Sequence, residues 1–137
     1  MTHPLTTLNR VPADVIKNFV DDLLPDLEPH GIRVLENRNG LVMLPAQDTA
    51  QGATFHLGEV LVSEARVRVG SSEGYSATLG RDLEQALAVA LLDAAQREQV
   101  LLERIMGFLE QQGQLQAAED HKLLRKVQAT RVQMETF

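Results

Sequence analysis

The hydrophobic residues of this chain follow a helical period near its start, a strand period in the middle and a helical period again to its end. Between residues 13 and 24, apolar side chains recur at spacings of three and four with polar or acidic residues between them. This is the pattern of an amphipathic helix. Pro12 suits its first turn, and Pro25 is expected to end or kink it. Alternatively, Leu27 extends the apolar face through one more turn before Pro29 and Gly31 stop the helix. Residues 1–10 are largely polar and are expected to be flexible.

From Ile32 the apolar period becomes two, which predicts β-strands. Asn37-Arg38-Asn39-Gly40 is a strong turn signal, so a hairpin is expected in which Leu41–Leu44 is the returning strand. The small polar residues 47–53 are expected to form a loop.

The second half of this region predicts further strands. Residues 54–69 are expected to form one long strand, or two strands broken by a bulge near Gly58. Gly70–Gly74 has the composition of a turn, and Tyr75–Leu79 is expected to return from it as a strand. Because alternating hydrophobicity suits a sheet with one covered face, the sheet is expected to be antiparallel.

The rest of the chain predicts helices. Asp82, with Gln85 three residues later, is an N-terminal cap of the capping-box type. A later helical run is expected to end at Gly107 or at Gln111-Gln112-Gly113. The last helix is expected from Leu115 to about Val132, and its clearest apolar positions are Leu123, Leu124 and Val127.

This order of elements predicts an α+β fold. It consists of an N-terminal helix, an antiparallel β-sheet of about four strands, and two or three C-terminal helices packed against the sheet. With 137 residues, and roughly 150 residues in a typical domain, residues 1–137 are expected to form a single domain. The 44% hydrophobic and 23% charged residues are ordinary for a globular protein, which argues against disorder of the whole chain.

Composition excludes several classes of function. The 13 Lys+Arg and 19 Asp+Glu residues give a net charge of −6 without a basic run, which argues against nucleic-acid binding. Without cysteine, the chain has no disulfide, thiolate zinc site, iron–sulfur ligand or cysteine nucleophile. No apolar run approaches the roughly 20 residues of a membrane span, and residues 1–10 lack the apolar core of a signal peptide. We therefore expect a cytoplasmic protein that binds no metal or cofactor itself.

The ordinary catalytic residue types occur without catalytic spacing. The four histidines are isolated in the sequence and form no metal-binding pair. Asp21, Asp22 and Asp26 lie on the polar face of the first predicted helix, where carboxylates are solvated. Ser71-Ser72 has no neighbouring base and suits a turn. No catalytic residue is predicted.

One constellation, Gly74-Tyr75 followed by Gly80-Arg81-Asp82, suits anion binding. A strand ends at Gly80 and a helix begins at Asp82, so the free amides of the helix could hold a phosphate together with Arg81. The alternative is structural: Gly80 supplies an unusual backbone angle, Asp82 caps the helix, and Arg81 is a surface residue. Tyr75, Gly80 and Arg81 are therefore candidate anion or partner contacts.

Six short segments occur in a fixed order along the chain. They are Gly40-Leu41-Val42-Met43, Phe55-x-Leu57-Gly58-Glu59, Gly74-Tyr75, Gly80-Arg81-Asp82, Ala90-Leu91-Leu92-Asp93-Ala94 and Ala129-Thr130-Arg131-Val132-Gln133-Met134. In this order and spacing they resemble the PhnG subunit family of the bacterial carbon–phosphorus lyase system. The resemblance covers most of the chain.

The resemblance implies a role in the use of phosphonates as a phosphorus source. Members of that family assemble with PhnH-, PhnI- and PhnJ-type subunits. With PhnI, PhnH and PhnL they support displacement of adenine from ATP by an alkylphosphonate. The PhnJ partner later breaks the carbon–phosphorus bond with S-adenosylmethionine and an iron–sulfur cluster. Because nucleosidase chemistry belongs to the PhnI partner, this chain is expected to be an accessory subunit.

The chain departs from the family pattern at several polar positions. Thr49-Ala50 stands where two glycines are usual, and Gln47 and Glu64 stand where basic residues are usual. Gln85-Ala86-Leu87 replaces a usual His-Ala-Glu, and the first helix lacks the family's tryptophan. These departures remove positive charge and a histidine, which argues against a phosphate-handling role at those positions.

Three hypotheses remain. The first is an assembly subunit of the phosphonate-to-ribose transferase complex. The second is a stand-alone small-molecule enzyme with an anion site at Arg81, and the lack of a nucleophile, acid–base pair or metal set counts against it. The third is a divergent family member that acts as a binding or structural module. Because the polar last helix buries little on its own, Arg131, Met134 and Phe137 are further candidate partner contacts, and the isolated chain is a candidate homo-oligomer.

Overall fold

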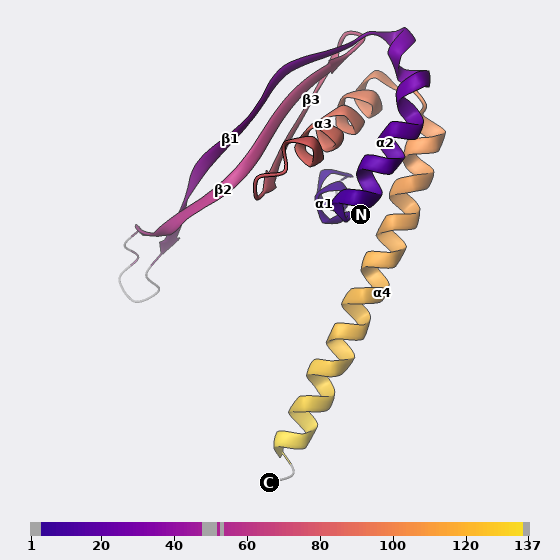
Figure 1. Cartoon of the computed structure of the whole chain (residues 1–137). Helices are drawn as coiled ribbons and strands as arrows, with labels where there is room; N and C mark the ends of the chain where they lie inside the picture. Colours follow the sequence, from indigo (N-terminus) through magenta and orange to yellow (C-terminus); the bar gives the residue numbers. More distant parts are fainter. Residues whose placement is uncertain (1–3, 48–51, 53, 136–137) are drawn as a thin grey trace.

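The computed structural model describes residues 4–47, 52 and 54–135, which form a β-sheet with helices on one of its faces (Figure 1). This arrangement confirms the predicted α+β class. In chain order the elements are α1 (Pro4–Arg10), α2 (Ala13–Leu27), the short 3-10 helix η1 (Glu28–His30), β1 (Ile32–Gln47), β2 (Thr54–Val69), β3 (Ser72–Leu79), α3 (Leu83–Glu98) and α4 (Leu102–Glu135).

The sheet is antiparallel in the order β1-β2-β3. β1 and β2 pair from Ile32 opposite Val69 to Gln47 opposite Thr54, whereas β3 reaches only as far as Val62 of β2. The outer halves of β1 and β2 therefore continue as a two-stranded ribbon beyond β3 (Figure 1).

The predicted turn at Asn37–Gly40 was wrong, because β1 runs straight through it. β2 supplies a partner for each residue of this segment, and Ser63 Oγ donates a 2.8 Å hydrogen bond to Asn39 Oδ1 across the strands. Long-range pairing thus overrides the local turn signal, and the described part of the chain has three strands instead of about four. β2 is one continuous strand with a register shift beside Gly58.

The core lies between the inner face of the sheet and α3. Alternate residues of β2 point inward and are fully buried, and α3 is buried around most of its circumference, as expected of a helix enclosed on several sides. Gly74 of β3 faces Ala90 and Ala94 of α3. On the far side of α3, the rings of Phe19 from α2 and Phe108 from α4 stack with centroids 3.9 Å apart.

The last helix is longer than predicted, because neither Gly107 nor Gly113 ends it. Glycine in a helix costs only about 1 kcal/mol relative to alanine. Buried residues at helical spacing continue across both glycines and hold the helix together, namely Ile105, Phe108, Leu109, Gln112 and Gln116. The two predicted helices are therefore one helix, whose C-terminal half projects beyond the rest of the protein (Figure 1).

The N-terminal segment contains a short helix. Pro4–Arg10 form α1, in which Leu8 is fully buried, and residues 1–3 lie outside the described part of the chain. The next helix, α2, continues through Pro25 to the fully buried Leu27. The extension of α2 through Leu27 is the one that its apolar face predicted.

Candidate functional site

The turn between β3 and α3 carries two predicted candidates, Gly80 and Arg81. Gly80 has a φ of +102°, a conformation that favours glycine. Asp82 caps α3: its Oδ1 accepts a 3.0 Å hydrogen bond from the amide of Gln85, and its Oδ2 lies 2.8 Å from Lys17 Nζ. The Lys17 ammonium, followed by the Gln85 amide, lowers the pKa of Asp82. The chain's own carboxylate therefore occupies this helix N-terminus.

Arg81 is exposed, and within the described ranges it has no ion-pair partner. An anion or partner surface at this turn would therefore meet the Arg81 guanidinium and not the capped amide. The structure is compatible with either interpretation of Arg81, and its role stays a prediction.

Tyr75 lies on the outer face of the sheet, where it is exposed. Its hydroxyl donates a 2.9 Å hydrogen bond to Glu64 Oε2, and Arg38 Nη2 lies 3.3 Å from Glu64 Oε1. The hydrogen bond to Glu64 raises the pKa of Tyr75, and the same bond lowers the pKa of Glu64. Among the described residues, no hydrogen bond joins Tyr75 to Arg81, and Tyr75 is bound to Glu64 instead.

The projecting end of α4 carries the clearest unpartnered surface. Every residue from 117 to 130 is exposed. Leu123, Leu124 and Val127 are exposed by 62%, 53% and 57% and lie on one side of the helix by their spacing. Of the other C-terminal candidates, Arg131 and Met134 lie within the last turns of α4, and Phe137 lies outside the described residues.

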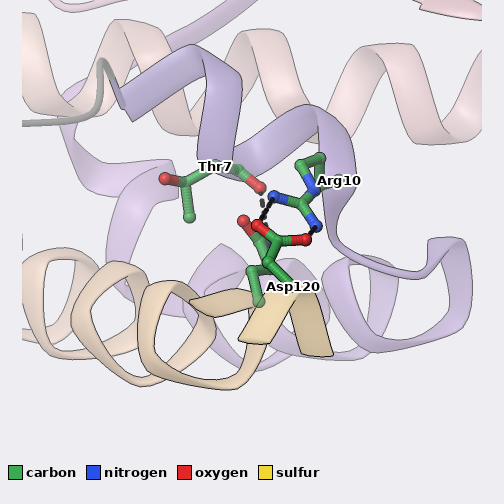
Figure 2. A network of polar contacts seen from close by, with 4 residues as sticks. Thr7, Arg10 and Asp120 are labelled. Carbon is green, nitrogen blue, oxygen red and sulfur yellow. Dashed lines mark hydrogen bonds and ion pairs between the residues drawn. The ribbon is translucent and has the colours of Figure 1, made fainter. Parts of the chain in front are cut away.

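A polar contact connects α1 to α4 at the point where the projecting part begins (Figure 2). Arg10 Nη1 and Nη2 donate hydrogen bonds of 3.1 and 2.8 Å to the two carboxylate oxygens of Asp120. One turn earlier, Gln116 Nε2 donates a 3.0 Å hydrogen bond to the backbone oxygen of Thr7. The Arg10 hydrogen bond lowers the pKa of Asp120, so this contact is fully charged at neutral pH.

An open groove of about 990 Å³ lies between α2, β1 and α3. Its apolar lining includes Val20, Leu24, Val34, Leu87 and Leu91, and Val34 is 50% exposed. We call it the α2–β1 groove.

The charged residues that line the α2–β1 groove are three acids, Asp14, Asp21 and Glu84, and one base, Lys17. Lys17 is already paired, with Asp82 at 2.8 Å and with Glu84 at 3.7 Å. Asp14 and Asp21 have no ion-pair partner within the described part of the chain, so the groove is apolar inside and acidic at its edge.

The described residues contain neither a metal-binding cluster nor a membrane-spanning helix. No group of three or more His, Cys, Asp or Glu side chains there is arranged to hold a metal ion. None of the described helices is both long enough and apolar enough to cross a membrane.

Comparison with known proteins gives two findings. A family model described as "Phosphonate metabolism protein PhnG" matches residues 2–137. The chain belongs to the PhnG family. It is also similar to the "Alpha-D-ribose 1-methylphosphonate 5-triphosphate synthase subunit PhnG" of Rhizobium meliloti (strain 1021), with 32% identity over 113 residues, which are 82% of this chain and 72% of that relative.

Two of the segments that carry the PhnG resemblance form one packing unit in the structure. Gly74 faces Ala90 and Ala94, and the amide of Tyr75 donates a 3.0 Å hydrogen bond to Oδ2 of the buried Asp93. In this chain, those residues of the PhnG pattern hold β3 against α3.

The positions at which this PhnG-family chain departs from the family pattern also have places in the structure. Glu64 forms an ion pair with Arg38 and accepts a hydrogen bond from Tyr75. The backbone amide of Gln85 donates a hydrogen bond to Asp82, and Leu87 lines the α2–β1 groove. Gln47 is the last residue of β1, and Thr49-Ala50 lies outside the described residues.

Sequence reasoning missed two features of this surface. The Arg10–Asp120 contact joins residues that are 110 positions apart, so no local pattern indicates it. The groove brings together α2, β1 and α3, and its residues look like ordinary core and surface positions when each element is considered alone. The acidic residues Asp14 and Asp21 on α2 were the available signal.

Proposed function

We propose that this chain is a non-catalytic assembly subunit of a carbon–phosphorus lyase core complex in the cytoplasm. In that role it supports the transfer of an alkylphosphonate onto the ribose of ATP with release of adenine, as part of organic phosphonate catabolism. Its partners would be PhnI-, PhnH- and PhnJ-type subunits. The assembly would use ATP, and the PhnJ-type partner would hold S-adenosylmethionine and an iron–sulfur cluster.

The exposed end of α4 is the observation that carries this proposal. Most of the stability of a helix in a protein comes from tertiary packing of its apolar face. Residues 117–130 are exposed throughout, and three of them present large apolar side chains. Such a segment gains stability when a second protein covers it, which is the behaviour expected of an assembly subunit. The "synthase subunit" in the name of the Rhizobium meliloti relative points to the same kind of role.

The distribution of polar side chains supports a non-catalytic role. Catalysis by a side chain usually needs a partly buried nucleophile, acid or base with a perturbed pKa. In the described part of the chain, the perturbed carboxyl groups of Glu64, Asp82 and Asp120 are each paired with a cation of the chain itself. The fourth, Glu98, accepts hydrogen bonds from the Ser71 amide and hydroxyl, and its pKa is lowered by its hydrogen bonds to Ser72 and Ser71. These pairs are accounted for by structure alone.

Co-expression with a PhnI-type partner, followed by affinity purification, tests the proposal. Deleting residues 130–137 should reduce co-purification while the unfolding transition is unchanged. Leu123→Ser should also weaken co-purification with the partner. Met106→Ser is the matched control, because Met106 is 52% exposed but lies on the packed half of α4. A chain that never co-purifies with the partner would refute the proposal. Release of adenine from ATP and methylphosphonate by this chain alone would refute its non-catalytic part.

A further inference from the structure

The α2–β1 groove and the end of α4 are complementary in charge. The groove carries Asp14 and Asp21 at its edge without ion-pair partners among the described residues. Residues 121–134 of α4 contain four basic residues and no Asp or Glu, in a chain whose net charge is −6. Basic and acidic surfaces of this kind attract each other and select each other's orientation.

The two surfaces are also complementary in their apolar parts. The groove exposes part of an apolar lining, with Val34 half exposed. The helix end presents Leu123, Leu124 and Val127 with Lys122, Arg125 and Lys126 beside them. An amphipathic helix that lays its apolar side into an apolar groove is a common mode of protein recognition.

The end of α4 does not lie in the groove of its own chain, because it projects away from the sheet and α2 (Figure 1). We propose that two copies of this chain associate reciprocally, with the α4 end of each copy in the α2–β1 groove of the other. Such a pair is related by a two-fold axis, so it contains the same contact twice. Each copy contributes one groove and one helix segment about 21 Å long, which suits the roughly 800 Å² per partner of a stable interface.

This inference concerns the chain without its partner subunits and goes beyond the proposed function. The mass of the full-length chain, measured by sedimentation velocity over a range of protein concentrations, tests it directly. The expected result is twice the mass of one chain, with dissociation favoured by high salt because the attraction is partly electrostatic. A chain that sediments as a monomer at all concentrations overturns the inference, whatever the outcome of co-purification with a PhnI-type partner.

Two sets of variants locate the contact. Leu123→Glu with Leu124→Glu should weaken dimerisation by about tenfold or more, because it places carboxylates in an apolar, acid-edged groove. Met106→Glu is the control, since it places a carboxylate on an exposed apolar residue of α4 outside both surfaces. Dimerisation that Met106→Glu weakens equally overturns the inference.

Charge exchange distinguishes the proposed contact from other dimers. Asp14→Lys with Asp21→Lys changes only the groove, and Lys122→Glu with Arg125→Glu changes only the helix end. Each pair should weaken dimerisation, and all four changes in one chain should restore it. A dimer that tolerates the groove changes but not the helix changes would be held by α4 against α4, and this result also overturns the inference.

Discussion

The contact between Gly74 and α3 provides a stability test of the fold. Gly74 is buried in β3, and α3 crosses directly over it. A Cβ atom added at Gly74 would lie 2.8 Å from the Cα of Ala94, and closer still to the backbone oxygen of Ala90 and the amide of Ala94. These are backbone atoms of a buried helix, so no side chain can rotate away to make room for Gly74→Ala.

The expected loss of stability follows from the distance that α3 must move to make room for the added Cβ atom. Ordinary contact between carbon atoms needs about 3.5 to 4.0 Å, so α3 must shift by roughly 1 Å from the sheet. A gap of that size forfeits about a quarter to a half of each dispersion contact that it opens. Overpacking of a core typically costs about 1 to 3 kcal/mol. Because rigid backbone is involved here, we expect a loss of about 3 kcal/mol or more for Gly74→Ala.

Urea unfolding followed by circular dichroism measures this loss. Gly113→Ala is the matched control, because Gly113 lies within α4 and an added Cβ meets nothing within 4 Å. Alanine is a better helix former than glycine, so the control should gain about 0.5 to 1 kcal/mol. The same substitution is thus expected to have opposite signs at the two positions. A Gly74→Ala variant within about 0.5 kcal/mol of the unmodified chain would refute the close approach of β3 and α3.

Three further predictions concern the candidate surfaces. Arg81→Ala should leave the melting temperature nearly unchanged, since exposed substitutions cost under about 0.5 kcal/mol, while weakening phosphate binding or complex formation; a loss of several kcal/mol would show a structural arginine instead. Asp82→Ala removes the cap of α3 and should lower the free energy of unfolding by about 0.5 to 2 kcal/mol, and an unchanged value in urea unfolding would contradict the capping role. Asp120→Asn should destabilise the chain at neutral pH. Because Arg10 lowers the folded-state pKa of Asp120, this difference should disappear as the pH falls through that pKa, and a pH-independent difference would exclude the ion pair as its cause.

Local patterns were sufficient for much of the fold. The amphipathic period of α2, the alternation of apolar residues in β2 and the cap formed by Asp82 with Gln85 each depend on neighbours a few residues apart, so they can be recognised in the sequence. The segments that resemble the PhnG family could be recognised for the same reason. The structure adds the physical role of Gly74 and Ala90, which is to let β3 and α3 approach closely.

Tertiary contacts decided the features for which local signals were misleading or absent. Asn37–Gly40 has the composition of a turn, yet its pairing with β2 keeps it extended, because each residue there finds a partner about 25 positions away. Gly107 does not end α4, because burial on both sides of it outweighs the small cost of glycine in a helix. The Arg10–Asp120 contact and the α2–β1 groove arise only when distant elements pack together. The sequence therefore determined the class of fold and the family, whereas packing decided which surfaces remain free for other proteins.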